Sequence, residues 1–148
     1  DARVMGRAAA GVIGIDLTEG DSVVGAIRCD DTADLLTVTQ NGYGKRTNQA
    51  EYLVQQEDGS TRCQSRGGKG RIDIKTEGRN GPVVAVRSVK EGDEMMLISR
   101  DGMIVRSPAA DVSRIGRNTM GVRVMQLREG DAVMSVAMVA DSDEAPAA

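Results

Sequence analysis

The residues best suited to chemistry in this sequence are the basic residues of a glycine-rich segment, Arg66-Gly67-Gly68-Lys69-Gly70. Glycine has no Cβ, so a glycine-rich backbone can approach a ligand closely and present its N–H groups. Arg66 and Lys69 could then reach anionic oxygens, which is the chemistry of phosphate binding. The alternative is a flexible loop whose charges only keep it in solvent.

An arginine recurs at the equivalent position of three similar segments, Gly6-Arg7, Ser65-Arg66 and Gly116-Arg117. One arginine per unit would form a row of cations along one edge of stacked units. Such a row can follow the phosphate backbone of a duplex without reading its bases. The alternative is that these arginines are solvated or pair with nearby carboxylates such as Asp16.

The net charge of −3 hides two basic segments. Residues 62–79 contain six basic and two acidic residues, and residues 100–128 contain the same numbers. The acidic residues gather in residues 1–34 and from residue 129 onward. Clustered cations on an acidic chain indicate an anionic partner, for which nucleic acid is the leading candidate.

Composition excludes most catalytic machinery. The chain has no His, so it cannot supply a Ser-His-Asp or Cys-His nucleophile or a His-ligated metal. Its two cysteines, Cys29 and Cys63, are too few for a zinc ribbon, an Fe–S site or a disulfide framework, and they favour a reducing, cytoplasmic compartment. No apolar run is long enough to span a bilayer, so we expect no membrane contact.

Two further segments invite a chemical interpretation that their spacing does not support. Residues 42–47 bring Gly, Lys and Thr together, but the Walker A spacing and its helix are missing, so nucleotide hydrolysis by this chain is not expected. Asp30-Asp31 lies in a turn without an electrophilic partner. We therefore expect no catalytic residue, no metal site and no cofactor in this chain.

The elements that must position the basic residues are repeated strands. Aligning Gly11, Gly70 and Gly121 gives periods of 59 and 51 residues, and residues 34–47 match residues 94–107 between them. Each of these two stretches has an Asn-Gly or Asp-Gly pair after an apolar run, which predicts a β-hairpin with a type I′ turn. Units of about 50 residues built from short antiparallel strands are typical of propeller-like blades.

We therefore expect an all-β fold for residues 1–139, with repeats at roughly 1–52, 62–112 and 113–139 and strand exchange between them. Residues 140–148 are expected to be a disordered acidic tail. Three units do not close a ring, and the chain begins with Asp rather than Met, so we expect it to be a piece of a longer protein.

Three motifs in order resemble the C-terminal domain family of the bacterial DNA gyrase A protein: TQNGYGKRT at residues 39–47, RNG at residues 79–81 and IGRNTMGV at residues 115–122. The resemblance covers nearly all of residues 3–139. It implies a β-pinwheel, a propeller-like array of four-stranded antiparallel blades, with about three of six blades present. It also implies that duplex DNA bends around a basic rim, so that an ATP-dependent type IIA topoisomerase introduces negative supercoils.

The hallmark box of that family reads Gln, a basic residue, Arg-Gly-Gly, a basic residue and Gly. Gln64 and residues 66–70 match it and Ser65 departs, which implies a degenerate copy in a later blade. Chemistry and resemblance together suggest DNA contacts by Lys45, Arg46, Arg66, Gly67, Gly68, Lys69, Gly70, Arg71, Arg106 and Arg117.

The resemblance implies double-stranded DNA as a partner. It also implies two protein partners, the gyrase B protein and a second gyrase A protein, both reached through an N-terminal region outside this sequence. Mg and ATP are implied for the whole enzyme only. Two alternatives stay open: the related C-terminal domain of topoisomerase IV, and a propeller-like protein-interaction module with an acidic partner. The preserved GKRT and GRNT segments favour gyrase.

Overall fold

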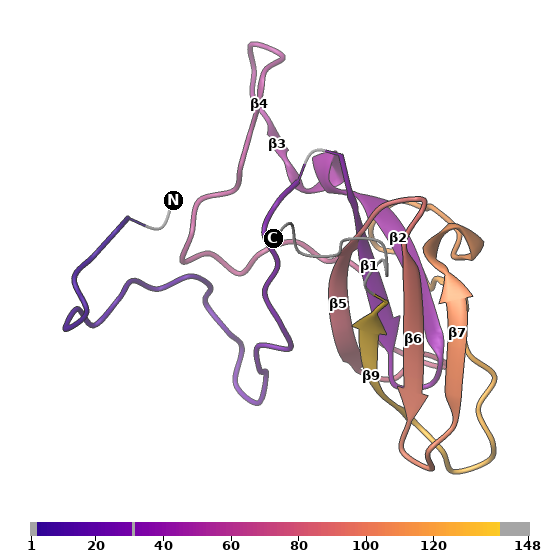
Figure 1. Cartoon of the computed structure of the whole chain (residues 1–148). Helices are drawn as coiled ribbons and strands as arrows, with labels where there is room; N and C mark the ends of the chain where they lie inside the picture. The colour runs from indigo at the N-terminus through magenta and orange to yellow at the C-terminus, as the bar shows by residue number, and fades with distance from the viewer. Residues whose placement is uncertain (1–2, 31, 140–148) are drawn as a thin grey trace, which may run out of the picture.

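Two similar β-hairpins form the centre of the fold in the computed structural model, which describes residues 3–30 and 32–139 (Figure 1). In the first, β1 (Asp34–Thr39) pairs antiparallel with β2 (Tyr43–Asn48). In the second, β6 (Glu94–Ser99) pairs antiparallel with β7 (Ile104–Pro108). Gly42 and Gly102 have φ of 81° and 85°, which these tight turns require. Both predicted hairpins are confirmed, but the predicted type I′ turn is wrong. That turn needs a positive φ at both central residues, and neither Asn41 nor Asp101 has one. Instead the amides of Gly42 and Gly102 donate to the Thr39 and Ser99 carbonyls, and only the glycine of each turn is left-handed.

Each hairpin is extended into a sheet by strands from later in the chain. β5 (Val83–Val89) and β8 (Val122–Arg123) complete a sheet of order β5-β1-β2-β8. β9 (Val133–Met138) completes a sheet of order β7-β6-β9. The strands of residues 113–139 are thus divided between the two sheets.

The remaining elements are short. β3 (Val54–Gln55) and β4 (Thr61–Arg62) form a separate two-stranded hairpin, and η1 (Gln49–Tyr52) and η2 (Ala109–Asp111) are single 3-10 turns. The described residues contain no α-helix and every strand pair is antiparallel, so the all-β prediction is confirmed. None of the described helices is long and apolar enough to cross a membrane.

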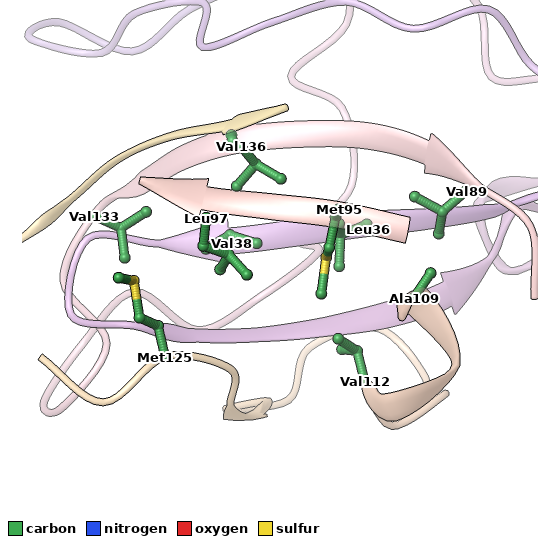
Figure 2. Close-up of a cluster of buried hydrophobic side chains, with 11 residues drawn as sticks. Leu36, Val38, Val89, Met95, Leu97, Ala109, Val112, Met125, Val133 and Val136 are labelled. Carbon is green, nitrogen blue, oxygen red and sulfur yellow. The ribbon is translucent and has the colours of Figure 1, made fainter. Parts of the chain in front are cut away.

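The hydrophobic core lies between the two sheets (Figure 2). Leu36 and Val38 of β1 face Met95 and Leu97 of β6, and all four side chains are fully buried. Burial of such side chains contributes roughly 1.5–3 kcal/mol each and is the main stabilising term of the fold. Met125 is also buried and fills part of this core.

The two sheets share an irregularity that supports the repeat interpretation. The pairing register shifts between Val38 and Thr39 in the first sheet and between Ile98 and Ser99 in the second. In both, the hydroxyl after the shift bonds within its own turn: Thr39 donates to the Tyr43 carbonyl, and Ser99 accepts from the Met103 amide.

Residues 3–30 contain no strand and run as an extended segment beside the sheets (Figure 1). Apolar side chains on this segment are exposed, among them Val4 and Ile13. The described residues therefore hold one four-stranded and one three-stranded sheet, and the expected number of about three blades is not confirmed. The predicted acidic tail, residues 140–148, lies outside the described residues.

Candidate nucleic-acid interface

Lys45, a predicted DNA contact, is completely buried in β2. Its Nζ donates to the carbonyl oxygens of Asp73 at 2.7 Å and Gly116 at 2.8 Å, and lies 3.1 Å from the Asp73 carboxylate. These three partners match the three donors of the ammonium, which is what a buried charge requires. Lys45 therefore fastens β2 to the segments around residues 73 and 116 and has no surface left for a phosphate.

Arg46, also predicted to contact DNA, is 8% exposed. Its Nε donates to the Val112 carbonyl at 2.8 Å, its Nη2 donates to the Ala110 carbonyl at 3.3 Å, and the Asp34 carboxylate lies 3.7 Å away. The guanidinium thus holds the η2 turn against the first sheet. The burial of Lys45 and Arg46 argues against DNA contact by either residue. The motif at residues 39–47 does not reveal this burial, because a sequence does not distinguish a buried cation from one at the surface.

The Asp73 carboxylate is the centre of a polar network around Lys45. The hydroxyls of Thr37 and Tyr52 each donate to it at 2.5 Å. Burial and the adjacent Asp73 charge raise the pKa of Tyr52 far above its usual value, because both disfavour the phenolate. The network joins β1, β2, η1 and the segment after the glycine-rich box, so it is a structural junction.

The box residues Arg66 and Lys69 and the adjoining Arg71 are exposed, as a phosphate contact requires. None of the three forms an ion pair within the described part of the chain. Arg66 Nη1 lies 3.4 Å from the Ile13 carbonyl, and Arg71 donates to the Leu53 carbonyl. Their positive charges are therefore not neutralised by neighbouring carboxylates.

The glycines of the box serve partly to dock another segment. The Gly67 amide donates to the Gly14 carbonyl at 2.8 Å, and the Gly68 carbonyl accepts from the Asp16 amide at 3.0 Å. Gly67 and Gly70 both adopt a φ of 77°, which glycine reaches without strain. The Gly67 N–H already has a hydrogen-bond acceptor. Phosphate contact by the box therefore depends on its side chains rather than on this amide.

The remaining two predicted contacts lie elsewhere. Arg106 on β7 has a side chain that is 62% exposed, but it ion-pairs with Glu94 of β6 through Nε at 3.0 Å and through Nη2. Arg117 is partly buried and donates from Nη1 to the Ile72 carbonyl at 3.0 Å. Arg66, Lys69 and Arg71 therefore share one exposed stretch of the chain, whereas Arg106 is ion-paired and Arg117 is partly buried.

A further basic cluster forms from residues that the sequence analysis did not predict as DNA contacts. The guanidinium carbons of Arg79 and Arg123 lie 4.6 and 5.6 Å from the ring centroid of Tyr43. Arg123 Nη2 also donates to the Tyr43 hydroxyl at 3.1 Å. This hydrogen bond and the two positive charges lower the pKa of Tyr43. Both arginines were counted in the basic segments. The pairing of β2 with β8 places Arg123 beside Tyr43, and a hydrogen bond from Asn41 to the Arg79 carbonyl ties residue 79 to the turn before Tyr43.

The family model described as DNA gyrase C-terminal domain, beta-propeller, matches residues 1–30, 33–56, 62–90 and 93–140. The chain belongs to this family. Curated relatives of this gyrase C-terminal domain include the DNA gyrase A subunits of Haloquadratum walsbyi, 47% identical over 117 residues, and of Staphylococcus epidermidis, 41% identical over 114 residues. The matches cover 78% and 76% of this chain but only 13% and 12% of those relatives.

Solved structures agree with the family. A DNA gyrase A C-terminal domain superposes on this one with a TM-score of 0.77 at 32% identity, over 93% of this chain and 44% of that chain. The C-terminal domain of a DNA topoisomerase IV gives a TM-score of 0.71 at 24% identity, over 88% and 38%. At that identity the second likeness concerns the fold alone, so the relationship to gyrase rests on the family model and the sequence relatives.

Proposed function

We propose that this gyrase C-terminal domain segment binds duplex DNA through its phosphate backbone and bends it around a basic rim. It would act within a gyrase A protein, so that an ATP-dependent type IIA topoisomerase introduces negative supercoils. The gyrase B protein, a second gyrase A protein, Mg and ATP would belong to the rest of that enzyme, which would work in the cytoplasm. We propose residues 1–139 as the DNA-wrapping unit.

The observation that carries this proposal is the set of exposed cations in and next to the box that have no carboxylate partner among the described residues, Arg66, Lys69 and Arg71. On a chain of net charge −3, six other cations each have a carboxylate within 4.0 Å: Lys45, Arg46, Lys90, Arg100, Arg106 and Arg114. Guanidinium and ammonium groups without an ion pair gain most from phosphate, because no carboxylate has to be displaced.

The binding we propose is independent of base sequence. The box offers cations on a backbone without bulky side chains, and it holds no aromatic residue for base stacking. Each phosphate neutralised by such cations contributes about −0.9 to the slope of log K against log salt. Steep salt dependence with little preference among duplexes is therefore the expected behaviour.

The test is to incubate the 148-residue chain with relaxed closed circular DNA and a nicking-closing enzyme, remove protein and read the linking number. A shift that grows with protein and disappears at high salt supports wrapping. Tight binding without a shift would reduce the proposal to DNA holding. No duplex binding would overturn the proposal and favour an acidic protein partner.

The matched variants are R66Q/K69Q and K90Q/R100Q. Both remove two positive charges from exposed residues, but Lys90 and Arg100 are paired with Asp30 at 3.5 Å and with Asp101 at 3.7 Å. We expect the box variant to weaken duplex binding and the control variant to leave it nearly unchanged. Equal losses would mean that only net charge matters.

A further inference from the structure

Arg79, Tyr43 and Arg123 form a second basic cluster, outside the glycine-rich box. Tyr43 begins β2 and pairs directly with Arg123 of β8. Both guanidinium groups lie within 6 Å of one ring centroid, as cation–π partners of the same aromatic ring. Arg79 is also held by a hydrogen bond from Nη2 to the Gly121 carbonyl at 3.2 Å.

The backbone that carries the cluster is firmly fixed. Asn80 is fully buried and donates from Nδ2 to the Met120 carbonyl at 2.8 Å, while Asn41 donates to the Arg79 carbonyl at 3.0 Å. These bonds tie the loop at residue 79 to the β1–β2 turn and to the chain entering β8. Because this backbone is already fixed, the two arginines lose little conformational freedom on binding a ligand.

Charge is unbalanced at this cluster. Neither Arg79 nor Arg123 has an ion pair in the described ranges, although Arg100, Arg106 and Arg114 each do. Two guanidinium groups sharing one ring repel each other, and an anion bound by both would remove that repulsion. The hydrogen bond from Arg123, and after it the charges of Arg123 and Arg79, lower the pKa of Tyr43.

The cluster is also accessible. β8 is an edge strand of the sheet β5-β1-β2-β8, and the opposite edge strand, β5, is the one that lies beside β9 of the second sheet. Arg79 and Arg123 are both exposed. An extended polyanion following this outer edge would meet both guanidinium groups.

We propose that Arg79 and Arg123, spaced by the ring of Tyr43, form a binding site for one backbone phosphate of duplex DNA. The site rests on the proposed function and adds to it a contact outside the glycine-rich box. The planar guanidinium donates two parallel hydrogen bonds, a geometry that suits phosphate oxygens. Lysine could not reproduce both the fork and the stacking on Tyr43.

The test compares R79Q/R123Q with the charge-matched control K90Q/R100Q in duplex binding at several salt concentrations. For R79Q/R123Q we expect roughly tenfold weaker binding and a salt slope reduced by about 0.9, equally for unrelated duplexes. Y43L keeps both charges but removes the aromatic ring between them, so we expect an intermediate loss of duplex affinity. Unchanged affinity of Y43L would overturn the role of the ring.

The outcomes separate this proposal from the proposed function. If the unaltered chain binds duplex and R66Q/K69Q weakens binding, but R79Q/R123Q behaves like the control, only the second site is overturned. If the unaltered chain does not bind duplex, both proposals fall. The NMR signals of the Arg79 and Arg123 Nε–H groups give a test independent of variant folding. They should shift when a short duplex is added, and unshifted signals would overturn the site.

Discussion

The guanidinium of Arg117 donates to the carbonyl oxygen of Ile72 at 3.0 Å. Arg66, which precedes Arg117 by 51 residues, makes the same contact with Ile13, which precedes Ile72 by 59 residues. The adjoining backbone bonds follow the same shifts. The Gly67 amide donates to the Gly14 carbonyl, and at the equivalent place the Asn118 amide donates to the Asp73 carbonyl. In the same way, the bond from the Asp16 amide to the Gly68 carbonyl recurs as the bond from the Lys75 amide to the Thr119 carbonyl. Arg66 and Arg117 therefore each hold the preceding repeat unit in place.

The contact between Arg117 and Ile72 predicts that replacing Arg117 lowers the stability of the fold. We expect R117Q to destabilise the fold by about 1 kcal/mol, because it removes a hydrogen bond of a charged donor and its stacking 5.8 Å from the Tyr52 ring. Hydrogen exchange should show faster amide exchange at Asn118 and Lys75. Unaltered exchange with weakened DNA binding would instead assign Arg117 to DNA contact.

The buried position of Lys45 makes K45M a test of its role. Removing the ammonium leaves two carbonyls and the Asp73 carboxylate without their donor, so we expect a loss of about 2–4 kcal/mol in the free energy of unfolding. Urea denaturation measures it, with K75Q as the control at an exposed lysine. Folded K45M should bind duplex as the unaltered chain does. Full stability with lost binding would restore Lys45 as a DNA contact.

Gly121 lies where two backbones meet. Its φ is 72°, and a Cβ there would approach the Gly44 carbonyl oxygen to 2.6 Å. We expect G121A to destabilise the protein by about 2 kcal/mol or more by pushing β8 away from β2. Gly92, where an added Cβ meets nothing within 4 Å, is the control position. Thermal unfolding of G121A and G92A compares the two, and equal midpoints would contradict this close approach.

The hairpins and the repeat could be predicted from the sequence, but the burial of Lys45 and Arg46 could not. Asn41-Gly42 and Asp101-Gly102 encode turns locally, so both hairpins could be predicted. The surroundings of Lys45 come from carbonyl groups 28 and 71 residues away, and no local pattern reports such distant partners. Arg79 and Arg123 likewise come together through tertiary contacts at Tyr43. Tertiary pairing therefore decides which cations remain available for binding.

The two tyrosines should titrate differently. The pKa of Tyr43 lies below its usual value, and burial beside Asp73 raises the pKa of Tyr52. Above pH about 10 the unfolded state ionises Tyr52 while the native state holds its proton, so stability should fall as pH rises. Tyrosinate absorbance should show one group ionising before unfolding. In Y52F the part of the stability loss due to Tyr52 should vanish, and an unchanged pH profile would contradict the assignment.

The ion pair between Arg106 and Glu94 makes E94Q informative about the rim. The Arg106 side chain is 62% exposed, so neutralising its partner frees a guanidinium on the edge strand β7. If Arg106 contacts DNA, E94Q should tighten duplex binding about two- to fivefold at low salt, and E94Q/R106Q should lose that gain. D101N is the control, because it neutralises a carboxylate 3.7 Å from Arg100 and changes net charge equally. Equal gains in E94Q and D101N would show a general charge effect and would remove Arg106 from the interface.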